Sequence, residues 1–409
     1  MNYDLSSLLF STLKVERDCY SGKTVVVTGA GGGIGFQIAR AFSMVGARVV
    51  LAELADSGKT AEEHIRAEGG DAVFIRTDVS DPDSIKQLLD ETHSKYGLIH
   101  TLINNAIFIR ESAVADMQLD MWDKTIAVNL RGSFMTCQAV LPEMMEAGDG
   151  IIINMVSTDA MPGLSAYIAS KQAICAFTQT LAIELQNSSI RVIPFAPGMV
   201  DTPGIRSVAE GLAPRLGLKK EEFLNLSLHA AYDGLMPVEH AAAATLLLAT
   251  RWAETYHGEL VNGYEILEKA GLISSALPIA DTKGISEHNI LGEETTLLKK
   301  LNEILIETAN EFDRLPAFVR PMAKQGFKNK SGHSLTDWQQ MVEKLHQKEI
   351  GYPDHWHEQL QRLYTYYQGV PAETARFTKD QAALEEINDL CGERMQIITK
   401  LMQINLTNK

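Results

Sequence analysis

Residues 24–35, which read TVVVTGAGGGIG, decide the fold of this 409-residue chain. The β-branched run at 24–27 is typical of a short buried strand, and the glycine-rich segment after it is typical of a turn. A helical pattern, QIARAF, begins at residue 37. A glycine motif between a strand and a helix carries weight that a lone motif lacks, because the helix start offers free backbone N–H groups.

The glycines of this turn have separate tasks. Gly29 allows the tight turn, Gly33 allows the backbone to approach a pyrophosphate, and Gly35 allows the helix to pack on the strand. The first turn of the helix, which contains Ile34, presents N–H groups and a positive dipole to phosphates. The sequence therefore predicts a dinucleotide site at this turn.

Further strands alternate with helical patterns along the chain. Apolar runs predict strands at 48–52, 72–75, 101–103, 151–154, 191–194 and 259–261. Strands separated by helices imply right-handed crossovers and a parallel sheet covered on both faces. We expect an α/β fold, a doubly wound Rossmann-type sheet of about seven strands.

An acidic residue ends the second predicted strand. Glu53 lies 18 residues after Gly35 (53 − 35), where a carboxylate can accept hydrogen bonds from the adenosine ribose. It would repel a 2′-phosphate, and no Lys or Arg stands between Gly29 and Gly35 to offset that repulsion. NAD is therefore predicted in preference to NADP, and a solvated strand end is the other interpretation of Glu53.

A proton-transfer site is predicted more than a hundred residues later. Tyr167 and Lys171 are four apart in a helical segment, so they share one face. An ammonium near a phenol lowers the pKa of the phenol, and such a tyrosine can exchange the proton of a secondary alcohol. The hydride must come from a cofactor, since no side chain carries one.

These motifs together resemble the short-chain dehydrogenase/reductase family, in its short, single-domain branch. The glycine turn has that branch's TGxxxGxG spacing, and the resemblance covers roughly residues 20–265. Asn104-Asn105-Ala106 resembles the motif that lines the cofactor, with Ile107 in place of its usual glycine. Two further matches are Asp78-Val79, which resembles the adenine-contacting pair, and Pro197-Gly198 with Val200 and Thr202, which resembles the loop that receives the nicotinamide amide.

The resemblance implies a role for each member of a catalytic set. Tyr167 is the general acid/base, Lys171 binds the nicotinamide ribose and lowers the tyrosine pKa, and Ser157 steadies the substrate oxygen. Asn129 anchors a water that links Lys171 to solvent. The family also implies a homodimer or homotetramer, built through the fourth and fifth helices of the fold.

The serine and the substrate loop leave alternatives open. Ser157 precedes Tyr167 by only 10 residues (167 − 157), so Thr158 and then Ser165 are alternatives. Residues 199–235, the expected substrate loop, predict a largely nonpolar lid. Its basic residues either are solvated or meet an anionic group of the substrate; they are Arg206, Arg215, Lys219 and Lys220.

Composition limits the partners and the cellular location that we expect. A formal net charge of −15 argues against nucleic acid or an anionic membrane as the main partner. Four scattered cysteines indicate neither a disulfide framework nor a zinc site, and the apolar N-terminal stretch is too short for a signal peptide. We expect a cytoplasmic protein acting on a small-molecule alcohol or ketone, with no metal. One polar cluster is interpreted as surface rather than as a metal site: Asp354, His355, His357 and Glu358.

After about residue 270, helical periodicity replaces strand patterns. We expect an N-terminal extension at 1–20, a dinucleotide-binding and catalytic domain at 21–268, and an all-α extension of about four helices at 269–409. Apolar stripes on these helices favour packing against the catalytic domain or a second subunit. The extension is a lid, an oligomerisation element or a docking module.

Two functions remain in view. The first is NAD-dependent interconversion of a secondary alcohol and a ketone. The second is a dinucleotide-responsive binding or regulatory protein that acts through its helical extension.

Overall fold

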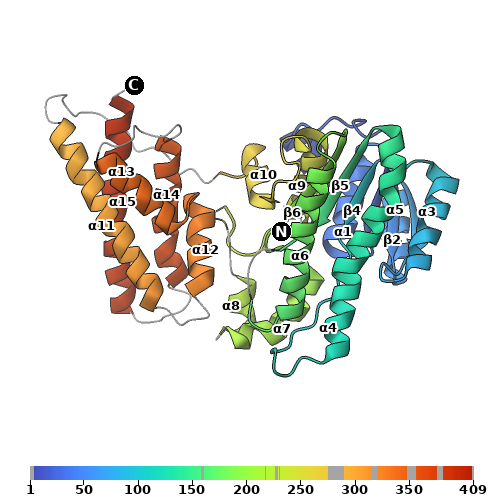
Figure 1. Cartoon of the computed structure of the whole chain (residues 1–409), viewed down its shortest axis with the longest axis horizontal. Coiled ribbons are helices and arrows are strands. Elements are labelled where there is room, and N and C mark those ends of the chain that lie inside the picture. Colours follow the sequence, from blue (N-terminus) through green and yellow to red (C-terminus); the bar gives the residue numbers. More distant parts are fainter. Residues whose placement is uncertain are drawn as a thin grey trace. The chain divides into compact units, whose positions relative to one another are not determined.

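A parallel sheet of seven strands forms the centre of the first part of the chain (Figure 1). The order is β3-β2-β1-β4-β5-β6-β7, and every neighbouring pair runs parallel. The strand order reverses between β1 and β4, which opens a crevice at their carboxyl ends. The predicted doubly wound sheet is confirmed. The strands are Thr24–Thr28 (β1), Arg48–Glu53 (β2), Asp71–Arg76 (β3), Thr101–Asn104 (β4), Gly150–Met155 (β5), Ile190–Ala196 (β6) and Val261–Asn262 (β7).

The chain divides into two units, Met1–Ile273 and Ser274–Lys409. The computed structural model describes residues 4–157, 161–216, 218–225, 229, 231–274, 290–314, 320–347, 356–374 and 381–407. Six predicted strands lie inside the observed ones, whereas the seventh overlaps β7 only at Val261. Residues up to Ile273 pack on the core of the first unit, so that unit ends five residues past the predicted boundary (273 − 268).

Helices cover both faces of the sheet because alternate strand residues point to opposite sides. Val25 and Val27 join the core beneath one group of helices, and Val26 joins the core on the other face. The first group comprises α1 (Gly33–Met44), α2 (Ser57–Ala67) and α9 (Val238–Leu247), and the second α3 (Pro82–Tyr96), α5 (Gly132–Ala147) and α6 (Ser165–Glu184).

The segment expected as an N-terminal extension is part of the first unit. It forms a short π-helical turn, Ser7–Thr12, and Leu5, Leu9 and Leu13 are buried in the same core as α1 and α9. Arg251 Nη2 donates to Leu13 O at 2.8 Å and to Lys14 O at 3.1 Å. The apolar residues of this segment therefore complete the core of the first unit.

The expected substrate loop is held at both ends. It carries α7 (Pro203–Arg215) and α8 (Lys220–Leu224). Val200 pairs with Met236, Met236 N–H donates to Met199 O and Asp201 N–H donates to Met236 O, both at 2.8 Å. Buried Leu212 and Phe223 belong to a small core that this loop forms with Leu164, just before Tyr167.

The second unit contains five helices in its described part, where about four were expected. Their apolar stripes pack on one another around buried Trp338, Trp356 and Tyr367, so this unit has its own core. Ser334 caps the helix that begins at Leu335, since its Oγ accepts from Asp337 N–H at 3.2 Å. The helices are α11 (Ile290–Arg314), α12 (Arg320–Ser331), α13 (Leu335–His346), α14 (Trp356–Thr374) and α15 (Gln381–Thr407).

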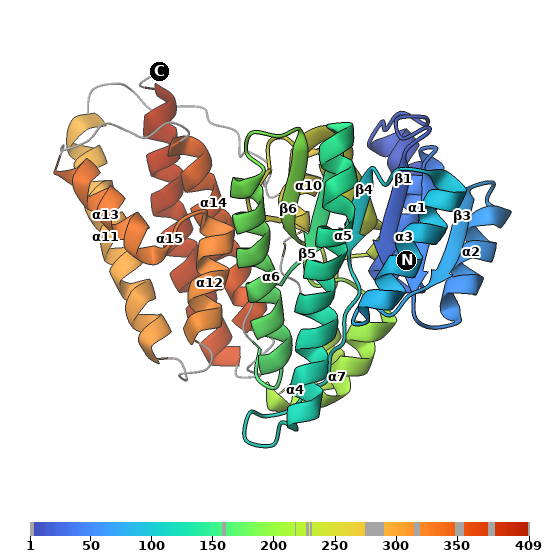
Figure 2. The same ribbon diagram turned by 45° about the vertical axis from the view of Figure 1, so that its right-hand side comes forward.

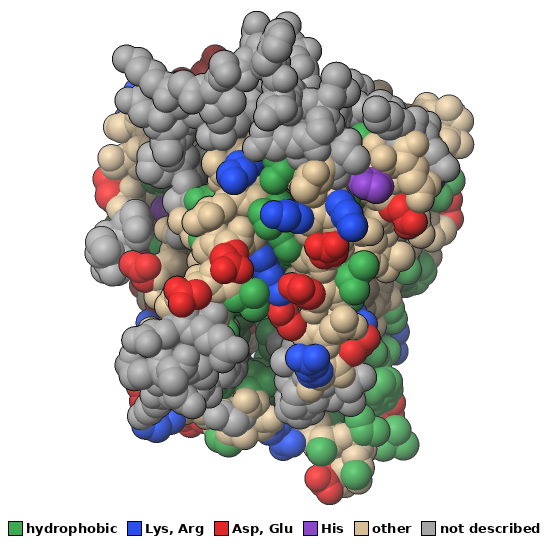
Figure 3. Space-filling view, turned by 90° about the vertical axis from the view of Figure 1, so that its left-hand side faces the viewer, with side chains coloured by type: hydrophobic (Ala, Val, Ile, Leu, Met, Phe, Trp, Pro, Cys, Tyr) green, Lys and Arg blue, Asp and Glu red, His purple; other side chains and the backbone are tan. Residues whose placement is uncertain are grey.

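The exposed surface in Figure 3 mixes both signs of charge, and basic and acidic side chains lie side by side across its middle. Within the second unit, Lys324 Nζ lies 3.1 Å from Asp313 Oδ1. Arg394 is buried and pairs with Glu311 at 2.6 Å and Glu307 at 3.3 Å. Among the described helices of the whole chain, none is long and apolar enough to cross a bilayer.

Candidate active site

The glycine turn is held by the segment after β4. A Cβ added to Gly29, whose φ is +65°, would lie 2.7 Å from Ala106 Cα, and one added to Gly35 would lie 2.4 Å from Gly29 O. Asn105 Nδ2 donates to Thr28 O and Gly29 O, each at 3.0 Å. Thr28 Oγ1 accepts from the N–H groups of Asn105 and Ala106, also at 3.0 Å. Close approach excludes larger residues at both glycines.

The start of α1 has room for an anion. Gly32 is its N-cap, so no side chain accepts from the first N–H groups, and a Cβ on Gly32 would meet nothing within 4 Å. Gly33 has φ +54°, and Thr202 of the opposite loop lies 3.6 Å from its Cβ position. Unsatisfied N–H groups at a helix start suit a phosphate. These residues fit the pyrophosphate of a dinucleotide.

Glu53 lies across the same turn. Its carboxylate accepts from Gly31 N–H at 3.1 Å and from Ala55 N–H at 2.9 Å. The guanidinium of Arg76 donates instead to Leu54 O and to the Asp56 carboxylate. The Glu53 carboxylate therefore lies beside the glycine turn, and the guanidinium of Arg76 is paired with Asp56 instead.

The Asp78-Val79 pair forms the next part of this edge. Asp78 Oδ1 accepts from Ser80 N–H at 2.9 Å and from Ser80 Oγ at 2.7 Å, which fixes the turn. A Cβ on Gly132 would lie 3.0 Å from Val79, and Arg131 Nη2 donates to Ser80 O at 2.6 Å. The start of α5 thus holds the predicted adenine-contacting segment in place.

Tyr167, Ser157 and Lys171 are brought together at the carboxyl end of β5. A hydrogen bond joins the side chains of Ser157 and Tyr167. Lys171 is buried, donates from Nζ to Met155 O at 2.6 Å, and has its Nζ 5.9 Å from the centroid of the Tyr167 ring. The alternative Thr158 lies outside the described residues. Ser165 Oγ is buried at the start of α6 and has no partner among the described residues.

Burial controls the protonation of this pair. Desolvation raises the pKa of Tyr167 to about 12, and the hydrogen bond from Ser157 opposes that rise. Desolvation also lowers the pKa of Lys171 to about 7. The sequence suggested a lowered tyrosine pKa, whereas in this structure the loss of solvent raises the pKa of Tyr167.

Asn129 occupies the centre of a π-helical segment, Ile126–Arg131 (η2), between α4 (Leu119–Thr125) and α5. Its Oδ1 accepts from Phe108 N–H at 2.7 Å, and its Nδ2 donates to Phe108 O at 3.1 Å and to Ser170 Oγ at 3.0 Å. The side chain joins the loop after β4 to α6. A water held by Asn129, which the resemblance implies, stays a prediction.

The Pro197-Gly198 loop follows β6 and faces the glycine turn. Gly198 has φ +103°, and Val200 pairs with Met236. Thr202 caps α7, since its Oγ1 accepts from Ile205 N–H at 3.2 Å. The predicted site residues therefore lie after the carboxyl ends of β1, β2, β3, β4, β5 and β6, on one edge of the sheet.

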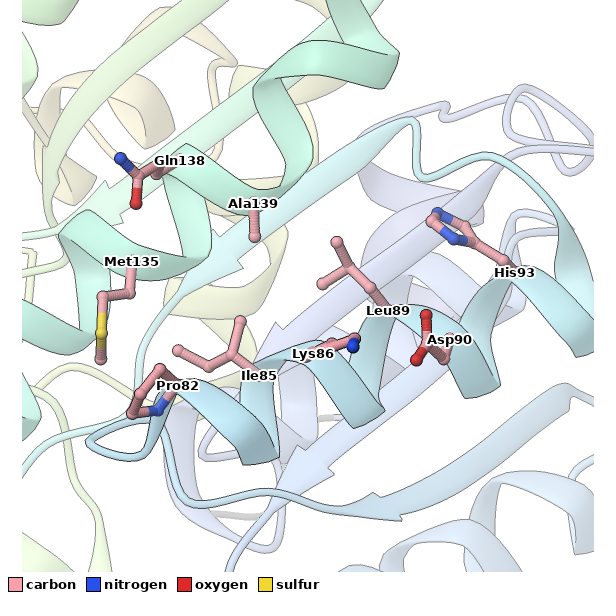
Figure 4. Close-up of a pocket in the computed structure, with 9 residues that line it drawn as sticks. All are labelled: Pro82, Ile85, Lys86, Leu89, Asp90, His93, Met135, Gln138 and Ala139. Atoms are coloured by element: carbon pink, nitrogen blue, oxygen red, sulfur yellow. The ribbon is translucent and has the colours of Figure 1, made fainter.

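One groove lies apart from the predicted site residues. A groove of about 310 Å³ lies between α3 and α5, and none of the predicted site residues lines it (Figure 4). Its walls are Pro82, Ile85, Lys86, Leu89, Asp90, His93, Met135, Gln138 and Ala139. The described part of the chain has no group of three or more His, Cys, Asp or Glu that could hold a metal. The cluster at Asp354, His355, His357 and Glu358 lies outside the described side chains.

Sequence reasoning missed three supporting residues. Thr28 bridges the glycine turn to Asn105, Ser170 holds Asn129, and the ring of Tyr264 lies against Gly198. The first two stand inside the quoted motifs, so their polar side chains were a signal. Tyr264 had none, because its partner is 66 residues away (264 − 198).

Comparison with known proteins gives one consistent result for the first unit. Residues 23–213 match the family model described as short chain dehydrogenase. The chain is similar to an uncharacterized oxidoreductase of Thermotoga maritima, with 38% identity over 44% of this chain and 72% of that protein. It is also similar to the 2-(R)-hydroxypropyl-CoM dehydrogenase of Xanthobacter autotrophicus, with 35% identity over 44% of this chain and 76% of that protein.

A solved structure agrees with these relatives. The crystal structure of an actinorhodin polyketide ketoreductase with NADPH has a TM-score of 0.56 and 27% identity. The similarity covers 59% of this chain and 97% of that one.

Proposed function

Because this chain belongs to the short-chain dehydrogenase family, we propose that it is an NAD(H)-dependent oxidoreductase that interconverts a secondary alcohol and a ketone. The observation that carries the proposal is the hydrogen bond between Ser157 and Tyr167 beside the buried Lys171. These three residues follow β5, which pairs with β4. The loop after β4 contains Asn105, which donates to the glycine turn at Gly29 O.

The chain's own residues supply binding and proton transfer. The glycine turn, Glu53, the Asp78-Val79 pair and the Pro197-Gly198 loop would hold a nicotinamide dinucleotide, which supplies or accepts the hydride when bound. Ser157 donates a hydrogen bond to the substrate oxygen. Tyr167 gives its phenolic proton to that oxygen during reduction and takes it back during oxidation.

Lys171 sets the charge next to the tyrosine. With a pKa of about 7, it changes charge near neutral pH. When it is protonated, its ammonium favours the phenolate of Tyr167 and can donate to ribose hydroxyls. The small core around Leu164, Leu212 and Phe223 supports a largely nonpolar substrate, and the substrate loop itself pairs Arg206 with Asp201 and Lys220 with Glu210.

Replacement of Tyr167 tests the mechanism. Tyr167→Phe removes the transferable proton, so turnover of secondary alcohols with NAD should fall by roughly 10²- to 10⁴-fold while NADH binding stays unchanged. Tyr256→Phe is the matched control, because that hydroxyl donates to Glu265 on another part of the unit. Full activity in Tyr167→Phe would contradict the assigned role.

The preference for NAD rests on Glu53. A carboxylate beside the glycine turn, with Arg76 paired to Asp56, disfavours a 2′-phosphate. Calorimetric titration should show a lower Kd for NADH than for NADPH. Glu53→Ala should bring these two dissociation constants closer together. Tighter binding of NADPH by the wild-type chain would overturn this assignment.

A homodimer or homotetramer is also proposed, through the fourth and fifth helices of the fold. The fourth is the continuous run of α4, η2 and α5, and the fifth is α6; α5 and α6 lie side by side (Figures 1 and 2). Phe134 packs edge-to-face on Phe177 across these helices, and Phe134, Met145 and Ile183 are exposed in the single chain. Sedimentation should show an oligomer that Phe134→Asp combined with Met145→Asp converts to a monomer. A monomeric wild type would refute the assembly.

A cytoplasmic location is part of the same proposal. All four cysteines are free thiols, which fits a reducing cytoplasm. Fractionation of the cells that produce the chain would test this.

A further inference from the structure

The ring of Tyr264 occupies the side of Gly198 where any other residue would carry its side chain. A Cβ on Gly198 would lie 2.8 Å from Tyr264 Cε2, 2.9 Å from Cζ and 3.0 Å from the hydroxyl oxygen. The preceding residue also fits tightly, because a Cβ on Gly263 would lie 2.4 Å from Pro197 O. The junction of β7 with α10 (Gly263–Lys269) therefore closes directly on the Pro197-Gly198 loop.

The same ring also meets the returning end of the substrate loop. The imidazole of His229 stacks on it, with ring centroids 5.3 Å apart and planes 8° from parallel. Tyr232 approaches the same ring at 6.0 Å. The substrate loop leaves the core at Met199 and returns at Met236. Tyr264 therefore contacts Gly198, just before the loop, and His229 and Tyr232, near its end.

Hydrogen bonds fix the His229 ring in this stack. Ala231 N–H donates to His229 Nδ1 at 3.1 Å, so the ring proton belongs on Nε2, which donates to Glu268 Oε1 of α10 at 2.9 Å. Tyr232 is held in turn, because its hydroxyl lies 2.7 Å from Nδ1 of the buried His240 on α9. The rings of His229 and Tyr232 are thus hydrogen-bonded to α10 and α9, respectively.

We propose that Tyr264 is a positioning residue that sets Gly198 for the nicotinamide end of the cofactor and ties that setting to the placement of the substrate loop. The inference rests on the proposed function, in which the Pro197-Gly198 loop receives the nicotinamide. Gly198 has φ +103° and, as a glycine, has no side chain that would restrain its backbone. The Tyr264 ring supplies the restraint from one side, and the stacked His229 supports that ring.

The test compares two ligands that differ in the nicotinamide alone. NADH and ADP-ribose are titrated against the full chain without substrate, for wild type, Tyr264→Leu and Tyr264→Phe. Tyr264→Leu removes the ring, so its Kd for NADH should rise about tenfold (about 1.4 kcal/mol) while its Kd for ADP-ribose stays unchanged. Tyr264→Phe keeps the ring and should restore NADH binding to within about twofold of wild type.

A second variant and a control complete the experiment. His229→Ala removes the stacked ring and should weaken NADH binding about threefold, again without effect on ADP-ribose. Tyr96→Leu is the same change at the end of α3, where the hydroxyl donates to Asp71, and it should leave both ligands unaffected. In turnover assays, Tyr264→Leu should raise KM for the cofactor more than it lowers kcat.

Three results would overturn the inference: equal weakening of both ligands, no change in Tyr264→Leu and His229→Ala, or a wild type that binds NADH no more tightly than ADP-ribose. Because binding is measured without substrate, a chain that oxidises no alcohol would contradict the proposed function and not this inference.

Discussion

At the scale of single residues, burial decides the protonation of Tyr167 and Lys171, the proposed catalytic pair. Lys171 is 3% exposed and has one hydrogen-bond acceptor, Met155 O, in place of bulk water. Its lowered pKa follows from that exchange, since a neutral amine tolerates burial better than an ammonium. The proton affinity of Tyr167 is shifted by the same cause in the opposite sense, because its charged form is the deprotonated one.

A pH-dependent contribution to stability follows for Lys171. Between pH 7 and 9 the unfolded lysine, with an ordinary pKa of 10.5, binds more protons than the folded one, whose pKa is about 7. Stability therefore rises with pH by on the order of 1 kcal/mol per unit, and falls again as pH drops to 7. Urea unfolding of wild type and Lys171→Met at pH 7, 8 and 9 should show that only the wild type gains this slope.

The control for this slope is Lys86→Met, at an exposed position, which should follow the wild type. Parallel pH profiles for wild type and Lys171→Met would show that burial of the lysine does not shift its protonation.

At the scale of elements, the π-helical segment η2 connects the loop after β4 to α6, which bears Tyr167. Asn129 lies within it and is fully buried. Its amide binds both backbone groups of Phe108 and also Ser170, which in turn donates to Tyr167 O at 2.6 Å. The segment therefore places α6, and with it Tyr167, relative to the loop after β4.

Truncation of Asn129 should destabilise the first unit more than loss of Ser170 does. Asn129→Ala leaves two backbone groups of Phe108 without their partner and should cost about 3 kcal/mol, whereas Ser170→Ala should cost about 1 kcal/mol. Urea unfolding of both variants and of the double variant measures these costs and their coupling. Equal costs for the two single variants would mean that the Phe108 contacts contribute little.

At the scale of the whole molecule, two separate cores divide the chain. Buried apolar clusters of the first unit contain residues up to Leu267, and the cluster of the second begins at Leu297, within the described ranges. The apolar stripes on α11 to α15, which were expected to favour packing on the catalytic domain or on a second subunit, bury one another in the described part of this unit. The role of the extension as a lid, an oligomerisation element or a docking module stays a prediction.

Removal of the second unit tests its part in cofactor binding. A fragment of residues 1–273 should stay folded and bind NADH within about twofold of the full chain, because each unit buries its own apolar residues. Calorimetry of the full chain should show two unfolding transitions and the fragment one. Loss of NADH binding in a folded fragment would show that the helical unit acts on the cofactor site.

The sequence by itself determined the sheet, the glycine turn and the spacing of the catalytic helix. Strands at 24–28 and 48–53 follow from β-branched runs, and Gly29 from a turn that needs positive φ. Tyr167 and Lys171 share a helix face because they are four residues apart. Each of these features depends on neighbours along the chain, which a linear pattern records.

Only the tertiary structure decided the rest. The direction of the Tyr167 pKa depends on how much solvent the fold removes, and the contact of Tyr264 with Gly198 joins segments 66 residues apart (264 − 198). The N-terminal segment belongs to the first unit because its leucines are buried in the same core as α9. Such contacts are set by packing between distant segments, and no periodicity or spacing in the sequence encodes them locally.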